Sequence, residues 1–308
     1  MSMNPSAVRV INPILTTHVQ GYRQPDLVGD ALFPAVPVDV TGGQVLEFGK
    51  EAFMQYVTRR APGTGTKRIT FGFQGKPYAL FNDALEAPVP REYLRDAKLV
   101  PGIDLATRAT NLVMNVLLRN KEVEQAEIAL NAANYDANHK IALSGTDKWS
   151  DAASDPISQV EDYKEAVRAT IGLYPNTLLL SAQAWRALKT NPKIKDQFKY
   201  TTPDAITTAM VAALFELDRV VVGKGISSTD AGVFSDIWGN NAVLAYVPLK
   251  PSGMEEPSYG YTYTLTGHPL VEEPYYDNNA KSWIYGVGYE RAPVLTGITG
   301  GFLIQAPK

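Results

Sequence analysis

The stretch DLATRATNLVMNVLLRNKEVEQAEIALNAAN, residues 104–134, decides the fold. Its apolar residues recur with the period of an amphipathic helix, and Asp104 stands where a capping side chain belongs. At 1.5 Å per residue, this predicted spine helix is roughly 45 Å long. One face is polar and includes Glu122 and Gln125, so we expect the helix to lie on a sheet with that face outward. The apolar positions are Leu105, Ala109, Leu112, Val113, Val116, Leu117, Val123, Ala126, Leu130 and Ala133.

After the spine, the pattern changes to short alternating helices and strands. Ser158 followed by Glu161 is typical of a capping box, and Gly172 stands where the helix 158–171 should stop. This alternation predicts a compact α/β unit. Its other expected elements are strands at 177–180, 219–222 and 242–247 and helices at 181–188 and 203–214.

Before the spine, the chain reads as two extended pieces. Residues 1–41 contain five prolines yet are rich in apolar side chains, which predicts an arm that packs on another surface. In residues 42–80, the alternation of Ile69, Phe71 and Phe73 predicts the return strand of a hairpin with a basic, glycine-rich tip. Such a hairpin is barely stable alone, so we expect it to pack outside its own domain.

The last sixty residues return to strand alternation. Residues 259–265 and 283–289 each alternate, and the segment 266–281 between them is polar. This pattern predicts a second extended hairpin.

Composition excludes several classes of function. The chain has 308 residues, 45% of them apolar, so it can bury a sizeable core. The net charge of −3 argues against a general nucleic-acid binder, and the lack of cysteine excludes disulfides and thiolate chemistry. No segment has the apolar run of a membrane span or a signal peptide, so we expect no membrane association.

No pattern of a catalytic, cofactor or metal site emerges. The three histidines, His18, His139 and His268, lack metal-site spacing, and no nucleophile elbow occurs. The glycines at 63–67 have the wrong spacing for a phosphate-binding loop. The carboxylates Glu122, Glu124 and Glu127 lack the histidines of a dimetal helix motif, so a solvated or intersubunit charged face is the better interpretation.

Several short strings, taken in order, resemble a known family. They are DALFPAVPV at 30–38, GTDKWSD at 145–151, SDPI at 154–157 and YPNTL at 174–178. The chain resembles the major capsid proteins of tailed bacteriophages, which have the Hong Kong phage capsid fold, also called the Johnson fold.

The resemblance covers essentially the whole chain and implies an α+β fold. The implied parts are an N-terminal arm (1–41), an E-loop hairpin (42–80), a P-domain with the spine helix (81–144), an α/β A-domain (145–250) and a late P-domain hairpin with a return strand to the A-domain (251–308).

The function implied by the resemblance is structural, not enzymatic. Pentamers and hexamers of the chain would form an icosahedral shell, assembled in the host cytoplasm, around double-stranded DNA held without sequence specificity. The implied partners are a scaffold protein, a portal and decoration proteins. The implied interfaces are the hairpin tip (Arg59, Arg60, Lys67, Arg68), the arm (Leu27, Leu32, Phe33, Val36) and a loop near the three-fold axis (His268, Glu272, Glu273, Asp277).

Two features depart from some members of that family. The arm signature begins near residue 27 after a short lead, without a long helical scaffolding segment, and no signature of a Lys–Asn crosslink occurs. We therefore expect a separate scaffold protein, or one fused to the protease, and no crosslink. Two alternatives stay open: an encapsulin-like nanocompartment shell that packages protein, and a soluble enzyme of unknown chemistry.

Overall fold

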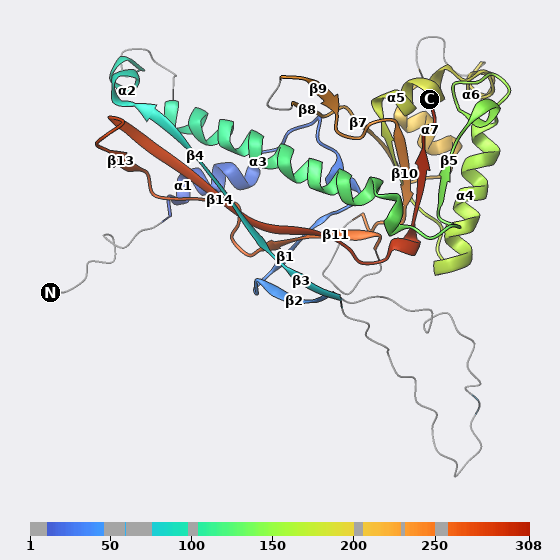
Figure 1. Ribbon diagram of the computed structural model, residues 1–308, viewed down its shortest axis with the longest axis horizontal. Helices are drawn as coiled ribbons and strands as arrows, with labels where there is room; N and C mark the ends of the chain where they lie inside the picture. The colour runs from blue at the N-terminus through green and yellow to red at the C-terminus, as the bar shows by residue number, and fades with distance from the viewer. Residues whose placement is uncertain are drawn as a thin grey trace.

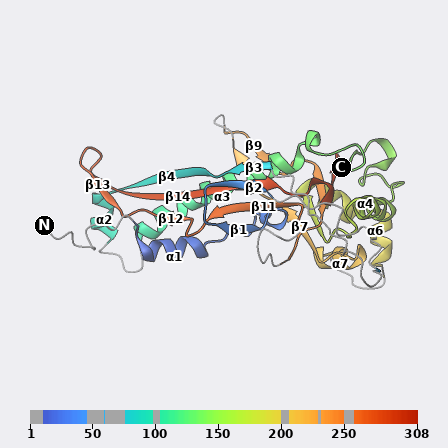
Figure 2. The ribbon, with the colours of Figure 1, turned by 90° about the horizontal axis from the view of Figure 1, so that it is seen from below.

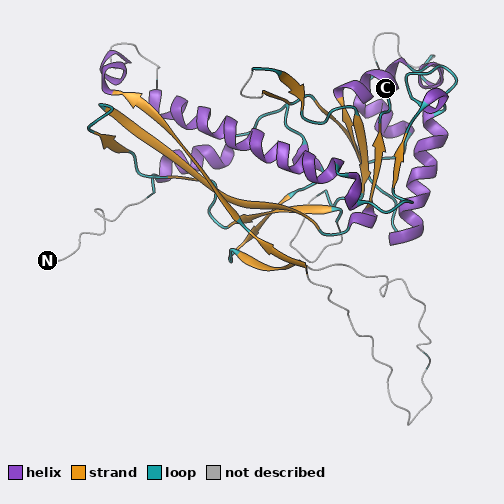
Figure 3. Ribbon diagram, in the orientation of Figure 1, coloured by secondary structure: helices purple, strands orange, loops and turns teal. Residues whose placement is uncertain are grey.

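The molecule combines an elongated part and a compact part (Figures 1 and 3). The elongated part carries a long helix and a six-stranded sheet, whereas the compact part carries a five-stranded sheet flanked by helices. The computed structural model describes residues 11–45, 59, 76–97, 104–199, 206–228, 232–249 and 258–308.

The predicted spine is helix α3 (Leu105–Leu130). As expected, Asp104 caps it: the carboxylate accepts hydrogen bonds from the backbone N–H groups of Ala106 (3.0 Å) and Thr107 (3.3 Å). The helix ends four residues before the predicted limit, because Asn131 adopts an extended conformation. The Asn131 side chain then caps a short 3-10 turn, η4 (Ala132–Asn134).

The sheet of the elongated part is built around one long strand, β14 (Ser282–Leu295). Its first ten residues pair antiparallel with β4 (Phe81–Pro90), and its last five pair antiparallel with β11 (Gly260–Leu265). The predicted hairpin between 259–265 and 283–289 is therefore wrong in register. Because β14 is twice as long as expected, its first half has other partners: β4 on one side, and β12 (Leu270–Val271) and β13 (Tyr275–Asp277) on the other.

Two helices cover one face of this sheet. Helix α1 (Pro13–Gly21) and the spine pack on Tyr285, Val287 and Tyr289 of β14. Figure 2 shows α1 lying to one side of β4 and β14. At the edge of the sheet, β1 (Ala35–Val38) pairs in parallel with β11.

The compact part matches the expected alternation. The predicted strands and the helix at 181–188 are confirmed to within two residues at each end. The strand order is β5 (Lys140–Ala142), β15 (Gly301–Gln305), β10 (Asn241–Ala245), β6 (Thr177–Ser181) and β7 (Arg219–Gly223). Its helices are α4 (Pro156–Ile171), α5 (Ala182–Thr190), α6 (Pro192–Gln197) and α7 (Thr208–Leu214).

Two helix starts differ from the prediction. Helix α4 begins at Pro156, because the Asp155 carboxylate accepts the Ser158 N–H (3.4 Å) and acts as the cap in place of Ser158. Glu161 pairs instead with Lys164 (2.9 Å). Helix α7 begins at Thr208, since the preceding threonine is extended and caps it. The predicted stop at Gly172 is confirmed: its φ of 74° is left-handed, as a helix-ending glycine allows.

The base of the predicted 42–80 hairpin is a short antiparallel pair. Strand β2 (Gly42–Val45) pairs with β3 (Lys76–Ala79). The predicted return strand at 69–73 lies outside the described residues. The remaining elements are α2 (Arg91–Ala97), β8 (Ile226–Ser228), β9 (Phe234–Asp236), η2 (Gly29–Ala31), η5 (Gly145–Asp147) and η6 (Ile298–Gly300).

Candidate assembly site

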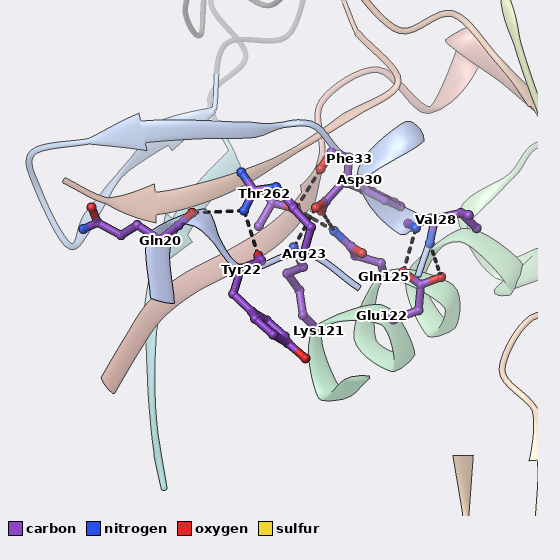
Figure 4. Close-up of polar contacts among 11 residues, drawn as sticks. Gln20, Tyr22, Arg23, Val28, Asp30, Phe33, Lys121, Glu122, Gln125 and Thr262 are labelled. Atoms are coloured by element: carbon purple, nitrogen blue, oxygen red, sulfur yellow. Dashed lines mark hydrogen bonds and ion pairs between the residues drawn. The ribbon is translucent and has the colours of Figure 1, made fainter. Parts of the chain in front are cut away.

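A buried polar junction holds the N-terminal segment on the spine (Figure 4). Its centre is Glu122, which is only 1% exposed. The carboxylate accepts hydrogen bonds from the backbone N–H groups of Val28 (3.0 Å) and Gly29 (2.6 Å) and from the Trp238 indole (2.6 Å). We call this contact between residues 28–33, the spine, Trp238 and Thr262 the arm junction.

The close approach of backbone to spine requires glycine at position 29. A Cβ atom there would lie 2.1 Å from Gln125 Oε1 and 2.7 Å from Glu122 Oε2. Both atoms belong to buried side chains that other hydrogen bonds hold in place: Glu122 accepts from Val28 and Trp238, and Gln125 donates to Asp30 and Thr262. Any larger residue would therefore push the segment away from the spine.

A second chain of contacts links the segment to the sheet. Asp30 accepts hydrogen bonds from Lys121 Nζ (2.8 Å) and Gln125 Nε2 (3.0 Å). The same Gln125 amide donates to Thr262 Oγ1 (2.9 Å), and that hydroxyl donates to the Phe33 carbonyl (3.0 Å). The spine, the segment and β11 are thus fixed in one register.

Burial sets the electrostatics of the junction. Desolvation raises the pKa of Glu122, and the three hydrogen bonds that it accepts only partly oppose this shift. For Lys121, burial is the largest single influence and favours the neutral amine, but the charge of Asp30, the hydrogen bond to Asp30 and the nearby Tyr289 together outweigh burial and raise the pKa of that lysine. Lys121 is therefore held as a cation against Asp30.

The apolar arm residues lie inside the subunit. Leu32 and Phe33 are fully buried and pack with Tyr259, and Val36 packs with Tyr261 and Tyr263. The expectation that these three arm residues form an intersubunit interface is therefore corrected: their apolar partner surface belongs to the same chain. Leu27 is half-buried and keeps some exposed surface.

The spine carboxylates are not the solvated face expected from the sequence. Glu122 is buried in the arm junction, and Glu124 pairs with Arg291 (3.0 Å), whose side chain is fully buried. The same guanidinium reaches Asp83 of β4 (2.7 Å), so it ties the spine to two strands. Only Glu127 of the three is exposed. Among the described residues, His, Asp and Glu form no group of three that could hold a metal ion.

The residues predicted near the three-fold axis lie along β14 but not in one place. His268 Nδ1 accepts the Glu290 N–H (3.1 Å), whereas Asp277 lies opposite Ser282. These positions are separated by roughly 25 Å along the strand. Glu272 and Glu273 lie between them and are exposed.

Of the predicted hairpin tip, the structure describes one residue. Arg59 is exposed. Arg60, Lys67 and Arg68 lie outside the described residues. Within the part of the chain that is described, no helix combines the length and apolar character of a bilayer span.

A spine helix on an elongated sheet, a compact five-stranded α/β part, a docked N-terminal segment and a paired hairpin base together define a capsid subunit of the Hong Kong phage fold. Comparison with known proteins supports this class. The family model "Phage major capsid protein E" matches residues 132–256. The major capsid protein of Burkholderia phage BcepMu is 35% identical over 305 residues, which cover 97% of each chain. The chain belongs to the phage major capsid proteins.

Solved structures agree in fold. The chain is similar to a phage-related protein from Bordetella bronchiseptica RB50, with 49% identity, a TM-score of 0.85 and coverage of 97% and 98% of the two chains. The capsid of cyanophage P-SCSP1u shares the fold at 9% identity, with a TM-score of 0.56 and coverage of 92% and 89%. The sequence relatives favour a phage capsid over an encapsulin-like shell. As a major capsid protein, the chain assembles into multimeric shells and is part of the virion.

Proposed function

We propose that this chain forms pentamers and hexamers that tile an icosahedral shell around the double-stranded DNA of a tailed phage, with a purely structural role. The observation that carries the proposal is the similarity to a phage major capsid protein along 97% of both chains. The net charge of −3 agrees with DNA that is confined rather than bound in a basic groove. Assembly takes place in the host cytoplasm, with a separate scaffold, a portal and possible decoration proteins as partners.

The hairpin tip is the proposed contact with a neighbouring subunit. Arg59, Arg60, Lys67 and Arg68 give it four positive charges, and Arg59 is exposed. Exposed carboxylates such as Glu127, Glu272 and Glu273 are available on the surface of a second copy. Complementary charge of this kind fixes the register of an interface more than it adds affinity.

The connection between β11 and β14 is the proposed contact near the three-fold axis. It carries Glu272, Glu273 and Asp277 toward the end of the elongated part, while His268 lies nearer its middle. Leu27 is the remaining arm residue with surface to offer a neighbour.

Electron microscopy of the protein, expressed alone and with its neighbouring phage genes, tests the proposal. We expect closed or tubular lattices for the unmodified chain. Replacing Arg59 and Arg60 by Glu should leave the circular-dichroism spectrum unchanged but prevent closed shells. The matched control replaces Arg186 and Lys189, two exposed basic residues of α5, by Glu. Normal shells from the hairpin variant would refute the tip interface, and uniformly monomeric wild-type protein under both conditions would refute the shell itself.

A further inference from the structure

Strand β4 lies at one border of the six-stranded sheet, and Figure 2 shows β14 between β4 and β12. Backbone groups alternate in direction along an antiparallel strand, so only every second residue of β4 can bond to β14. Just after β4, the Arg91 N–H donates to the Lys281 carbonyl that precedes β14 (3.1 Å). The odd-numbered residues of β4 therefore face β14, and the even-numbered residues point their backbone N–H and C=O groups away from the sheet. On the other side of β14, the Gly286 carbonyl accepts the Glu272 N–H (3.0 Å), as the same alternation requires.

Both ends of this outer edge are closed to a further strand. Just before β4, the Leu80 N–H donates to the Thr41 carbonyl (2.8 Å), next to the pairing of β2 with β3. At the far end of β4, Pro88 and Pro90 point outward but have no N–H to donate. A strand from outside could therefore pair only with the part of β4 between these two ends.

The middle of the outer edge stays open. Its three outward-facing residues, Asn82, Ala84 and Glu86, are all exposed. Their outward N–H and C=O groups have no backbone partner among the described residues. We call residues 82–86 the open edge. Natural sheets protect such an edge with lysine, proline or a bulge, because it can pair with the strand of another chain. Proline protects only one end here, which points to a strand that binds between the two ends.

The side chains beside the open edge suit such a strand. Phe81 and Leu85 are 68% and 39% exposed, and they project on the sheet face that carries the spine. Asp83 lies between them, and its carboxylate is already paired with Arg291 (2.7 Å). An incoming strand would therefore cover two apolar side chains on this face without meeting an unpaired charge.

We propose that the open edge binds a short extended segment of a second copy of this chain, so that the sheet continues across the boundary between two subunits. The inference rests on the proposed shell. The open edge recurs on every subunit, so an occupant that covers all of them must be as abundant as the subunit itself. A neighbouring copy in the shell meets that requirement. Thr41 and Pro88 limit the pairing to residues 82–86.

Hydrogen exchange measured by mass spectrometry tests the contact on the unmodified protein. We expect the outward amides of Asn82, Ala84 and Glu86 to exchange at least roughly tenfold more slowly in shells than in free subunits, because a paired N–H exchanges only when the contact opens. Protection in shells of this chain alone identifies a second copy as the occupant. Equal exchange in the two forms overturns the proposal, and so does protection that appears only when other phage proteins are present.

A proline substitution tests the same contact through assembly. Ala84→Pro removes the central outward N–H but leaves the pairing with β14 intact, because Pro88 and Pro90 already occupy outward positions of the same strand. We expect an unchanged circular-dichroism spectrum. The protein concentration needed for shells in electron micrographs should rise at least about tenfold. Ala84→Ser, which keeps the N–H, is the matched control and should assemble like the wild type.

The outcomes separate this contact from the shell itself. Normal assembly of a folded Ala84→Pro protein overturns the strand contact and leaves the proposed shell in place. Wild-type protein that forms no shells under any condition overturns both. If Ala84→Pro alters the circular-dichroism spectrum, the exchange measurement on the wild type decides alone.

Discussion

Leu178 in the compact part and Glu122 in the arm junction are both shut off from solvent, yet one lies among apolar side chains and the other among hydrogen-bond donors. Apolar burial stabilises in proportion to area and has no direction. A buried carboxylate is stable only where its donors are in place. The compact core therefore supplies bulk stability, whereas the arm junction selects one register for the N-terminal segment.

The largest effect is expected in the compact core. Leu178→Ala removes a fully buried leucine from β6 and should lower the free energy of unfolding by about 4 kcal/mol. Urea denaturation at one fixed protein concentration measures this. Leu249→Ala, at a leucine that is 54% exposed, is the control and should change stability by less than about 1 kcal/mol. Equal losses from the two variants would contradict the assignment of the core.

The second-largest loss of stability is expected in the arm junction, and it can be compared with the loss in the compact core. Glu122→Ala leaves the N–H groups of Val28, Gly29 and Trp238 buried without their acceptor, so we expect a loss of about 3 kcal/mol. Trp238 fluorescence should shift as the segment leaves the spine. Glu127→Ala, five residues further along the spine on its exposed surface, is the matched control with little expected effect. A Glu122→Ala protein as stable as the control would show that the junction is dispensable.

A smaller effect is expected from one added methyl group. Gly29→Ala places a Cβ against Gln125 and Glu122 and should cost about 2 kcal/mol through overpacking. Gly21→Ala, where an added Cβ meets nothing within 4 Å, should be neutral or slightly stabilising. Thermal unfolding of the pair provides the measurement, and coincident midpoints would argue against a tight junction.

The smallest effect is a pH dependence. Because burial raises the pKa of Glu122 above its ordinary value of 4.5, the folded chain holds more protons than the unfolded chain between those two values. The free energy of unfolding should therefore fall as the pH rises from 4.5 to the raised pKa, and stay level above it. The slope cannot exceed about 1.4 kcal/mol per pH unit. Glu122→Gln should lack this contribution, so identical pH profiles for the two proteins would contradict the shift.

The sequence predicted the regular elements better than the polar contacts. Asp104, Gly172 and the strands of the compact part follow local rules, and the structure has them where the patterns indicate. Gln125 was assigned to the outward face because it is polar, and no contact was predicted for Lys121, yet both are buried. Their positions do carry a signal: they continue the line of Val113, Leu117 and Ala129 at four-residue spacing, all of them buried.

Local sequence rules could not predict contacts between residues that are far apart in the sequence. Glu122 is satisfied by residues 28, 29 and 238, and Arg291 by Asp83 and Glu124, all brought together only by the fold. The wrong register predicted for β14 has the same cause. An alternating pattern predicts a strand, but it does not predict which neighbouring strand pairs with it. The arm residues were assigned to another subunit for this reason too.

The pairing of β1 with β11 also fixes an order of events during synthesis. Ala35 lies beside Thr262, and β15 fills the place between β5 and β10, so neither sheet is complete until the last fifth of the chain exists. At ordinary translation speeds, roughly 10 to 45 s separate the appearance of β1 from that of its partner. During that interval β1 has no strand to pair with. A ribosome-bound subunit is therefore unfinished in both of its large sheets, so we expect shell growth to draw on complete, released chains.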